Sequence, residues 1–169
     1  ACNHFAWASW QPERDAETLL SLMDKSGMGW TRDEILWKNF ELTKGDYKIL
    51  PINESALDIA KKYGIKQLLI LAYGNELYTG TTAHIPSTTT QINAFCNYAR
   101  QFVADTKDRV KYYEIWNEPN TSGAFNDGDD GTNYGNLVKA VYPVIKEENP
   151  DAYVMGYSAT GLNKVTDKA

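Results

Sequence analysis

The chain has few of the residues from which metal sites and histidine-based catalytic triads are built. Its 169 residues include only two histidines, His4 and His84, and only two cysteines, Cys2 and Cys96. The cysteine spacing fits no metal-ligand pattern, and two histidines give little support for a zinc cluster or a Ser/His/Asp triad. We therefore predict no metal site and no cofactor. We expect Cys2 and Cys96 to be buried free thiols in preference to a disulfide.

Long apolar runs and concentrated positive charge are also missing. No apolar run approaches the roughly 20 residues that span a bilayer, and the first residues lack the pattern of a signal peptide. The 22 acidic and 17 basic side chains give a net charge of −5, without a basic stripe that could neutralise a phosphate backbone. We expect neither a membrane nor a nucleic acid as partner. A start at Ala1 is expected of a processed, secreted chain, in an extracellular or periplasmic location, or of an excised piece of a longer chain.

The sequence does contain alternating strand-like and helix-like segments, which are typical of one α/β domain. Its hydrophobic content of 43% is enough to form a core. The third predicted strand is continuously apolar in its middle, as expected of a parallel strand covered on both faces. We predict helices over residues 14–25, 55–62 (capped by Ser55), 91–105 and 137–148, and strands over 3–8, 29–35, 67–73, 110–116 and 152–158.

This order of segments fits a parallel sheet, either open and doubly wound or closed as a barrel. A doubly wound nucleotide-binding fold usually has a glycine-rich phosphate turn after its first strand. Residues 6–12 read Ala-Trp-Ala-Ser-Trp-Gln-Pro and contain no glycine. The barrel is therefore favoured, and a doubly wound domain for a nucleotide or flavin is the weaker alternative.

The most informative stretch is residues 114–120, Glu-Ile-Trp-Asn-Glu-Pro-Asn, at the end of a predicted strand. Barrel active sites are assembled at the carboxyl ends of strands. A glycosidic bond is cleaved by two carboxyl groups, one of which protonates the leaving oxygen, and Glu118 is placed like that proton donor. The alternative is a loop glutamate that happens to precede Pro119. Asn117 could donate to a sugar hydroxyl, and Glu114 is expected to pair with a buried cation.

Arg32, Tyr73 and Asn75 are further candidates near strand ends. Arg32 could orient a catalytic carboxylate through paired hydrogen bonds, or form a core charge pair with Glu114 or Glu34. Tyr73 and Asn75 could contact substrate hydroxyls or cap their loop.

Tryptophans near strand ends could stack on sugar rings. Trp116, Trp7 and Trp37 are candidates for this role, and Trp30 is expected to pack in the core. Side-chain alternation is expected to put Trp116 on the same strand face as Glu114 and Glu118. The acidic loop 126–131 is expected to be solvated, because it lacks the full calcium-loop pattern.

Three segments make the chain resemble clan A glycoside hydrolases, which are retaining enzymes on a (β/α)8 TIM barrel. The similarity is greatest to relatives of β-xylosidases and bacterial exopolysaccharide hydrolases. The segments are 30–34 (Trp-Thr-Arg-Asp-Glu), 71–75 (Leu-Ala-Tyr-Gly-Asn) and 113–120 (Tyr-Glu-Ile-Trp-Asn-Glu-Pro-Asn). The resemblance implies that Glu118 is the general acid/base, that Asn117 contacts the 2-hydroxyl of the sugar next to the scissile bond, and that Arg32 steadies the nucleophile.

The resemblance also implies that residues 1–169 are the N-terminal portion of one catalytic barrel, which stops after about strand five. Such enzymes cleave β-linked oligo- or polysaccharide with a nucleophilic Glu that follows strand seven, so this chain alone lacks it unless Glu34 or Glu76 is recruited. A noncatalytic carbohydrate-binding protein is the alternative. Because a partial barrel exposes apolar faces and strand edges, we expect self-association or pairing with the missing barrel segment.

Overall fold

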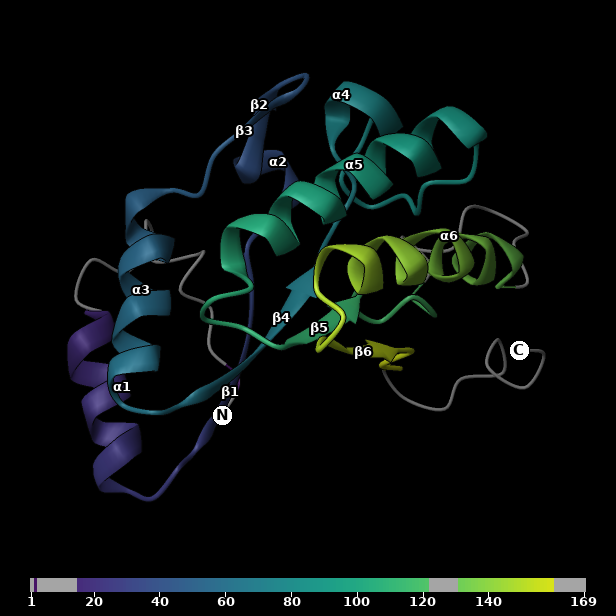
Figure 1. Ribbon diagram of the computed structural model, residues 1–169. Coiled ribbons are helices and arrows are strands. Elements are labelled where there is room, and N and C mark those ends of the chain that lie inside the picture. Colours follow the sequence, from purple (N-terminus) through teal and green to yellow (C-terminus); the bar gives the residue numbers. More distant parts are fainter. Residues whose placement is uncertain (1, 3–14, 122–130, 160–169) are drawn as a thin grey trace.

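The computed structural model describes residues 2, 15–121 and 131–159, in which strands and helices alternate along the chain (Figure 1). The main sheet contains β1 (Trp30–Glu34), β4 (Lys66–Leu71), β5 (Tyr112–Ile115) and β6 (Tyr153–Gly156). The long helices are α1 (Ala16–Lys25), α3 (Pro51–Lys62), α5 (Thr89–Thr106) and α6 (Thr132–Glu148). The predicted strand 3–8 lies outside the described residues.

All neighbouring strands of the main sheet are parallel, in the order β1-β4-β5-β6. Each strand is therefore added on the same side of the one before it, which is how a barrel wall is wound. A doubly wound sheet instead reverses its direction and has helices on both faces. The described residues form an open parallel sheet whose strand order is compatible with either a barrel wall or one half of an open sheet.

The helices pack on one face of the sheet. Buried side chains of alternate strand positions, such as Leu69 and Tyr113, share a core with α5 and α6. On the same face, the Gln67 amide donates to the Leu57 carbonyl of α3 at 3.4 Å, and α1 packs against α3. Figure 1 shows α5 and α6 side by side over β4 and β5.

Among the described residues, no helix packs on the opposite face of the sheet, which is only partly buried. On this face Ile70 of β4 and Glu114 of β5 are 1% and 3% exposed, so the expectation that the third predicted strand is enclosed on both sides holds for Ile70 and not for Leu68. Leu68 is half-exposed, and on the flanking strands Trp30 and Tyr153 are 45% and 62% exposed. In a closed barrel this face is the interior, which side chains from all strands fill together.

Four short elements follow the strands and were expected to be loops. They are α2 (Trp37–Phe40), β2 (Glu41–Thr43), β3 (Asp46–Tyr47) and α4 (Glu76–Thr79). The first three connect β1 to α3, and α4 lies between β4 and α5. Each is too short to show a period in the sequence.

Several predicted boundaries and environments need correction. Helix α3 begins at Pro51, so Ser55 lies inside the helix and does not cap it. Proline suits the first helical position because its fixed φ matches that of a helix. The N–H that proline lacks would have no partner within the helix there, so no hydrogen bond is lost. Helix α6 begins at Thr132, ahead of the predicted residue 137. Cys96 is half-buried and Cys2 is exposed, and both are free.

Among the described residues, no helix has the length and apolar character needed to cross a membrane.

Candidate active site

An ion pair on the sheet face opposite the helices joins β1 and β5 across β4. Arg32 of β1 donates from Nε and Nη2 to the two carboxylate oxygens of Glu114 on β5, each at 2.8 Å. Glu114 is 3% exposed, and its hydrogen bonds and charge raise the pKa of the Arg32 guanidinium despite partial burial. Parallel two-point contact of this kind fixes both side chains. The predicted pairing of Glu114 with a cation is confirmed, although Arg32 is only partly buried.

The network continues from Arg32 to the ends of β4 and β5. Arg32 Nη2 also donates to Asn117 Oδ1 at 2.7 Å, and Asn117 Nδ2 lies 2.8 Å from the Tyr73 hydroxyl. Arg32, Tyr73 and Asn117 are thus brought together although they come from three separate segments. Burial raises the pKa of the Tyr73 phenol, and the nearby charges of Glu34 and Glu118 raise it further, against the lowering effect of Asn117 and Arg32.

Glu118 follows this network in a tight turn. Its backbone has φ of 47°, its N–H donates to Ser158 Oγ at 3.4 Å, and its carbonyl accepts from the Thr121 N–H and hydroxyl at 3.0 and 3.1 Å. The side chain is half-buried, and within the described part of the chain its carboxylate makes no hydrogen bond. The backbone is therefore fixed while the carboxyl group is left available to a ligand.

Trp116 does not lie on the same face as Glu114, which corrects the expectation from strand alternation. Its φ of 67° ends the regular strand and turns the indole into the core, where it is fully buried. The ring makes an edge-type contact with Tyr73 and a tilted contact with Phe95, with centroids 5.7 and 6.2 Å away. Trp116 supports Tyr73 from beneath and offers no face to a sugar.

Two other predicted site residues have structural roles. Trp37 is fully buried, stacks between Tyr78 and Tyr98 with centroids 5.2 and 5.3 Å away, and donates to Glu41 at 2.6 Å. Asn75 is 2% exposed, and it caps α4 by accepting from the Leu77 N–H and donates to the Glu41 carbonyl.

Of the remaining predictions about tryptophans and the acidic loop, only the one for Trp30 falls on fully described residues. Trp7 and most of the loop 126–131 lie outside the described residues. Trp30, which was expected to pack in the core, is 45% exposed and contacts Tyr112 edge-on at 4.6 Å.

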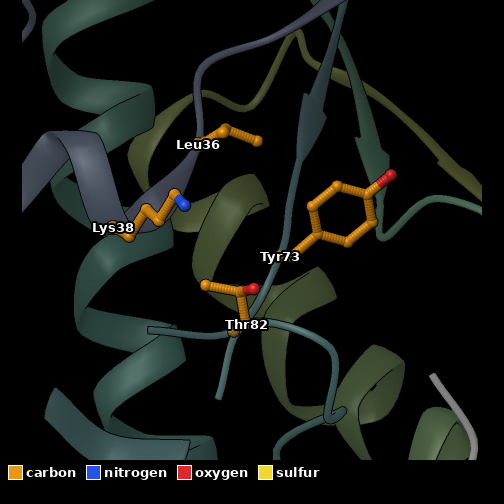
Figure 2. A pocket seen from close by; sticks show the side chains of 5 residues that line it. Leu36, Lys38, Tyr73 and Thr82 are labelled. Atoms are coloured by element: carbon orange, nitrogen blue, oxygen red, sulfur yellow. The ribbon is translucent and has the colours of Figure 1, made fainter. Parts of the chain in front are cut away.

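A pocket of about 160 Å³ adjoins the network through Tyr73. Figure 2 shows the Tyr73 ring on one side of it and Lys38 on the other, with the Tyr73 hydroxyl pointing away from both Lys38 and Thr82. The other lining residues are Leu36 and Gly74. A Cβ on Gly74 would come within 2.7 Å of Thr79 Oγ1 and the Thr81 carbonyl, so the wall is closely packed there.

Sequence reasoning missed this pocket, although one signal could have found part of it. Leu36 and Lys38 directly follow a predicted strand, at the end where barrel active sites form. Thr82 carried no such signal, because its loop reaches the pocket through a backbone hydrogen bond from Gly74 to the Thr82 carbonyl at 2.9 Å.

The arrangement suits proton transfer beside a hydroxyl-rich ligand. Glu118 supplies a half-buried carboxyl group, and the neighbouring amide, phenol and guanidinium can bind oxygen atoms. In the described residues, no group of three or more His, Cys, Asp or Glu side chains could hold a metal ion.

Several solved structures with a similar fold are of proteins named as glycoside hydrolases. A family 39 glycoside hydrolase from the gut symbiont Bacteroides cellulosilyticus WH2 superimposes with a TM-score of 0.74 at 26% identity over 85% of this chain. An exo-β-1,4-mannosidase from Opitutaceae bacterium strain TAV5 gives 0.72 at 20% identity over 91%. The chain resembles the clan A glycoside hydrolases. The endoglucanase of Thermotoga maritima gives 0.67 at 18% identity over 90%.

The chain covers only a part of each of these glycoside hydrolases. It spans 29% of the family 39 hydrolase and of the mannosidase, and 48% of the endoglucanase. No protein-family model and no curated protein matches the sequence. At these identities, the mannosidase and the endoglucanase support the α/β fold with its parallel sheet.

Proposed function

We propose that the chain is the N-terminal portion of a retaining glycoside hydrolase that cleaves β-linked oligo- or polysaccharide. The observation that carries this proposal is the half-buried, unengaged carboxyl group of Glu118 beside the Arg32–Asn117 hydrogen bond. The likeness to clan A glycoside hydrolases supports the same chemistry. On this proposal residues 1–169 belong to one (β/α)8 barrel that further strands complete.

In the proposed reaction Glu118 acts twice. It first protonates the leaving glycosidic oxygen while a second carboxylate attacks the sugar, and it then takes a proton from the water that releases the sugar. Asn117 contacts the 2-hydroxyl of that sugar, and Arg32 steadies the nucleophile. The nucleophile is a carboxylate about 5 to 5.5 Å from Glu118, supplied by the segment that completes the barrel.

A polymeric substrate is too large to enter a cell intact, so the same proposal places the protein outside the cytoplasm, in the extracellular or periplasmic space.

A noncatalytic carbohydrate-binding protein is the second candidate. The observation that favours it is the placement of two other carboxylates of the chain. Glu114 is bound by Arg32, and Glu76 is exposed on α4. Such a chain would keep the sugar groove and turn nothing over.

The two candidates are separated in a protein that carries this chain together with the further barrel strands, by titration with cello-, xylo- and manno-oligosaccharides while hydrolysis is assayed. Glu118→Gln serves as the test variant, and Glu147→Gln, at an exposed position of α6, serves as the matched control. Binding without turnover in the wild type and in Glu118→Gln supports the binding protein. Hydrolysis that Glu118→Gln removes and Glu147→Gln retains supports the hydrolase. Absence of binding to every sugar contradicts both.

A further inference from the structure

The direction of the hydrogen bonds in the site follows from Arg32. A guanidinium has only N–H donors, so any atom that it bonds must be an acceptor. Arg32 Nη2 lies 2.8 Å from Glu114 Oε1 and 2.7 Å from Asn117. The atom of Asn117 at that distance must therefore be its carbonyl oxygen. This argument fixes the amide orientation, which otherwise is ambiguous because oxygen and nitrogen have similar size.

The fixed amide in turn fixes the role of Tyr73. With its oxygen on Arg32, Asn117 presents its NH2 group to the Tyr73 hydroxyl at 2.8 Å and donates to it. The phenol oxygen is then the acceptor, and its own proton is left for another partner. Among the described residues the Tyr73 hydroxyl donates no hydrogen bond, and Figure 2 shows it pointing away from Lys38 and Thr82.

Glu114 is what holds Arg32 in this position. Its two oxygens accept hydrogen bonds from Nε and Nη2 of Arg32 at 2.8 Å. The second hydrogen of Nη2 is then directed at Asn117. At 3% exposure, Glu114 itself is too enclosed by the sheet to contact a ligand. Without the carboxylate, the guanidinium could rotate, and the Asn117 amide could turn its oxygen toward Tyr73.

We propose that Glu114 is a positioning residue which, through Arg32 and Asn117, makes Tyr73 a hydrogen-bond donor to an oxygen atom of the bound sugar. The sugar as ligand rests on the proposed function, whereas the orientation of the network does not. The Tyr73 hydroxyl would thereby select a sugar with an acceptor oxygen at that place.

The orientation is tested without a ligand, by NMR of the Asn117 side-chain amide, whose signals are assigned by their loss in Asn117→Asp. Tyr73→Phe should shift these signals, because it removes the acceptor. Glu114→Gln should shift them too, although it touches neither group. The matched control is Glu54→Gln, which removes a carboxylate from the Arg109 ion pair outside the site. It should leave the signals unchanged.

Unchanged Asn117 signals in Glu114→Gln would overturn the positioning role. If this variant does not fold, because it leaves a buried guanidinium without its counter-charge, Glu114→Asp replaces it. Aspartate keeps the charge but is one methylene shorter, so it cannot hold both nitrogens in the same geometry. The same shift is expected, and its absence has the same meaning.

The role in sugar binding is tested by calorimetry with the oligosaccharide that the wild type binds best. Tyr73→Phe should lower the affinity about tenfold, which is the effect of losing one hydrogen bond. Glu114→Gln should do the same, and the double variant should lose at most about twofold more, because both changes remove one donor. Losses that multiply to about a hundredfold would contradict the positioning role while leaving the proposed function intact. If no sugar binds, the proposed function and the sugar contact fail together, and the NMR result alone decides the orientation.

Discussion

Two residues with positive φ decide how the loop after β5 presents its side chains. Trp116 has φ of 67° and Glu118 has φ of 47°. Such values are uncommon for residues other than glycine, because Cβ then approaches the backbone. At Trp116 the turn puts the indole in the core, and at Glu118 it leaves the carboxyl group half-buried at the strand end. The candidate acid is therefore placed by a local departure from strand geometry.

This strain predicts an unusual order of stability at position 118. We expect Glu118→Gly to be more stable than Glu118→Ala, with a free energy of unfolding about 1 kcal/mol higher, because glycine adopts positive φ without a steric cost. Both variants lack the carboxylate, so the difference reports the backbone alone. Urea denaturation of the two proteins measures it.

The matched control is Glu147, an exposed residue inside α6. There the alanine variant should be more stable than the glycine variant by a similar amount, because glycine is unfavourable in a helix. An alanine variant at position 118 that equals or exceeds the glycine variant would show that the loop is not strained in solution.

At the scale of elements, the sequence predicts what is long and periodic and misses what is short. The helices α1, α3, α5 and α6 and the strands from β1 to β6 that form the main sheet were expected within a few residues of their bounds, α6 excepted. The four-residue α2 and α4 were not, because one helical turn has no measurable period.

The site shows the same division between pattern and packing. The motif at residues 114–120 made Glu118 and Asn117 candidates, and of the two partners expected for Arg32 the structure shows Glu114. It could not predict that Trp37 lies in an aromatic stack, because a buried and a ligand-facing tryptophan look alike in sequence. Nor could it reveal positive φ at Trp116, since nothing in that residue type favours it.

The ionisation of Tyr113 on β5 should change the free energy of unfolding with pH. Burial raises the pKa of the Tyr113 phenol from 10.0 to about 12, against hydrogen bonds that lower it. Below pH 10 the folded and unfolded chains both keep the proton. Between pH 10 and 12 the unfolded chain loses it while the folded chain holds it, so the free energy of unfolding falls by about 3 kcal/mol from this group.

Tyr113→Phe isolates this contribution. Wild type is expected to be more stable than the variant below pH 10, because Tyr113 also bonds Thr106 at 3.0 Å. That advantage should shrink as the pH rises above 10. Chemical denaturation at several alkaline pH values measures it, and a constant difference between the two proteins would contradict the burial of the phenol.

At the scale of the whole molecule, the dominant feature of the described residues is that their helices pack on only one face of the main sheet. The opposite face carries a row of aromatic rings, with Trp30 and Tyr112 at 4.6 Å and Tyr112 and Tyr153 at 5.1 Å between centroids. Met155 beside them is 49% exposed. A continuous apolar patch on an edge strand favours association.

We predict that the chain self-associates through this face, or binds the segment that completes the barrel when both are present. The double variant Tyr153→Lys/Met155→Lys should shift sedimentation velocity toward the monomer, because it puts two like charges on the face. Leu22→Lys is the control, since Leu22 is 53% exposed on α1, away from the sheet. A wild type that is monomeric at all concentrations and unfolds cooperatively would contradict the prediction.

The central claim is that Glu118 is the acid/base of a glycoside hydrolase, and its most direct test is the dependence of hydrolysis on the leaving group. The measurement compares wild type and Glu118→Ala in a protein that carries this chain together with the further barrel strands. Glycosides with poor leaving groups should lose about 10²–10⁴-fold in kcat/KM, because their departure needs a proton. Activated aryl glycosides should lose far less. An equal loss on both classes would contradict the assignment of Glu118.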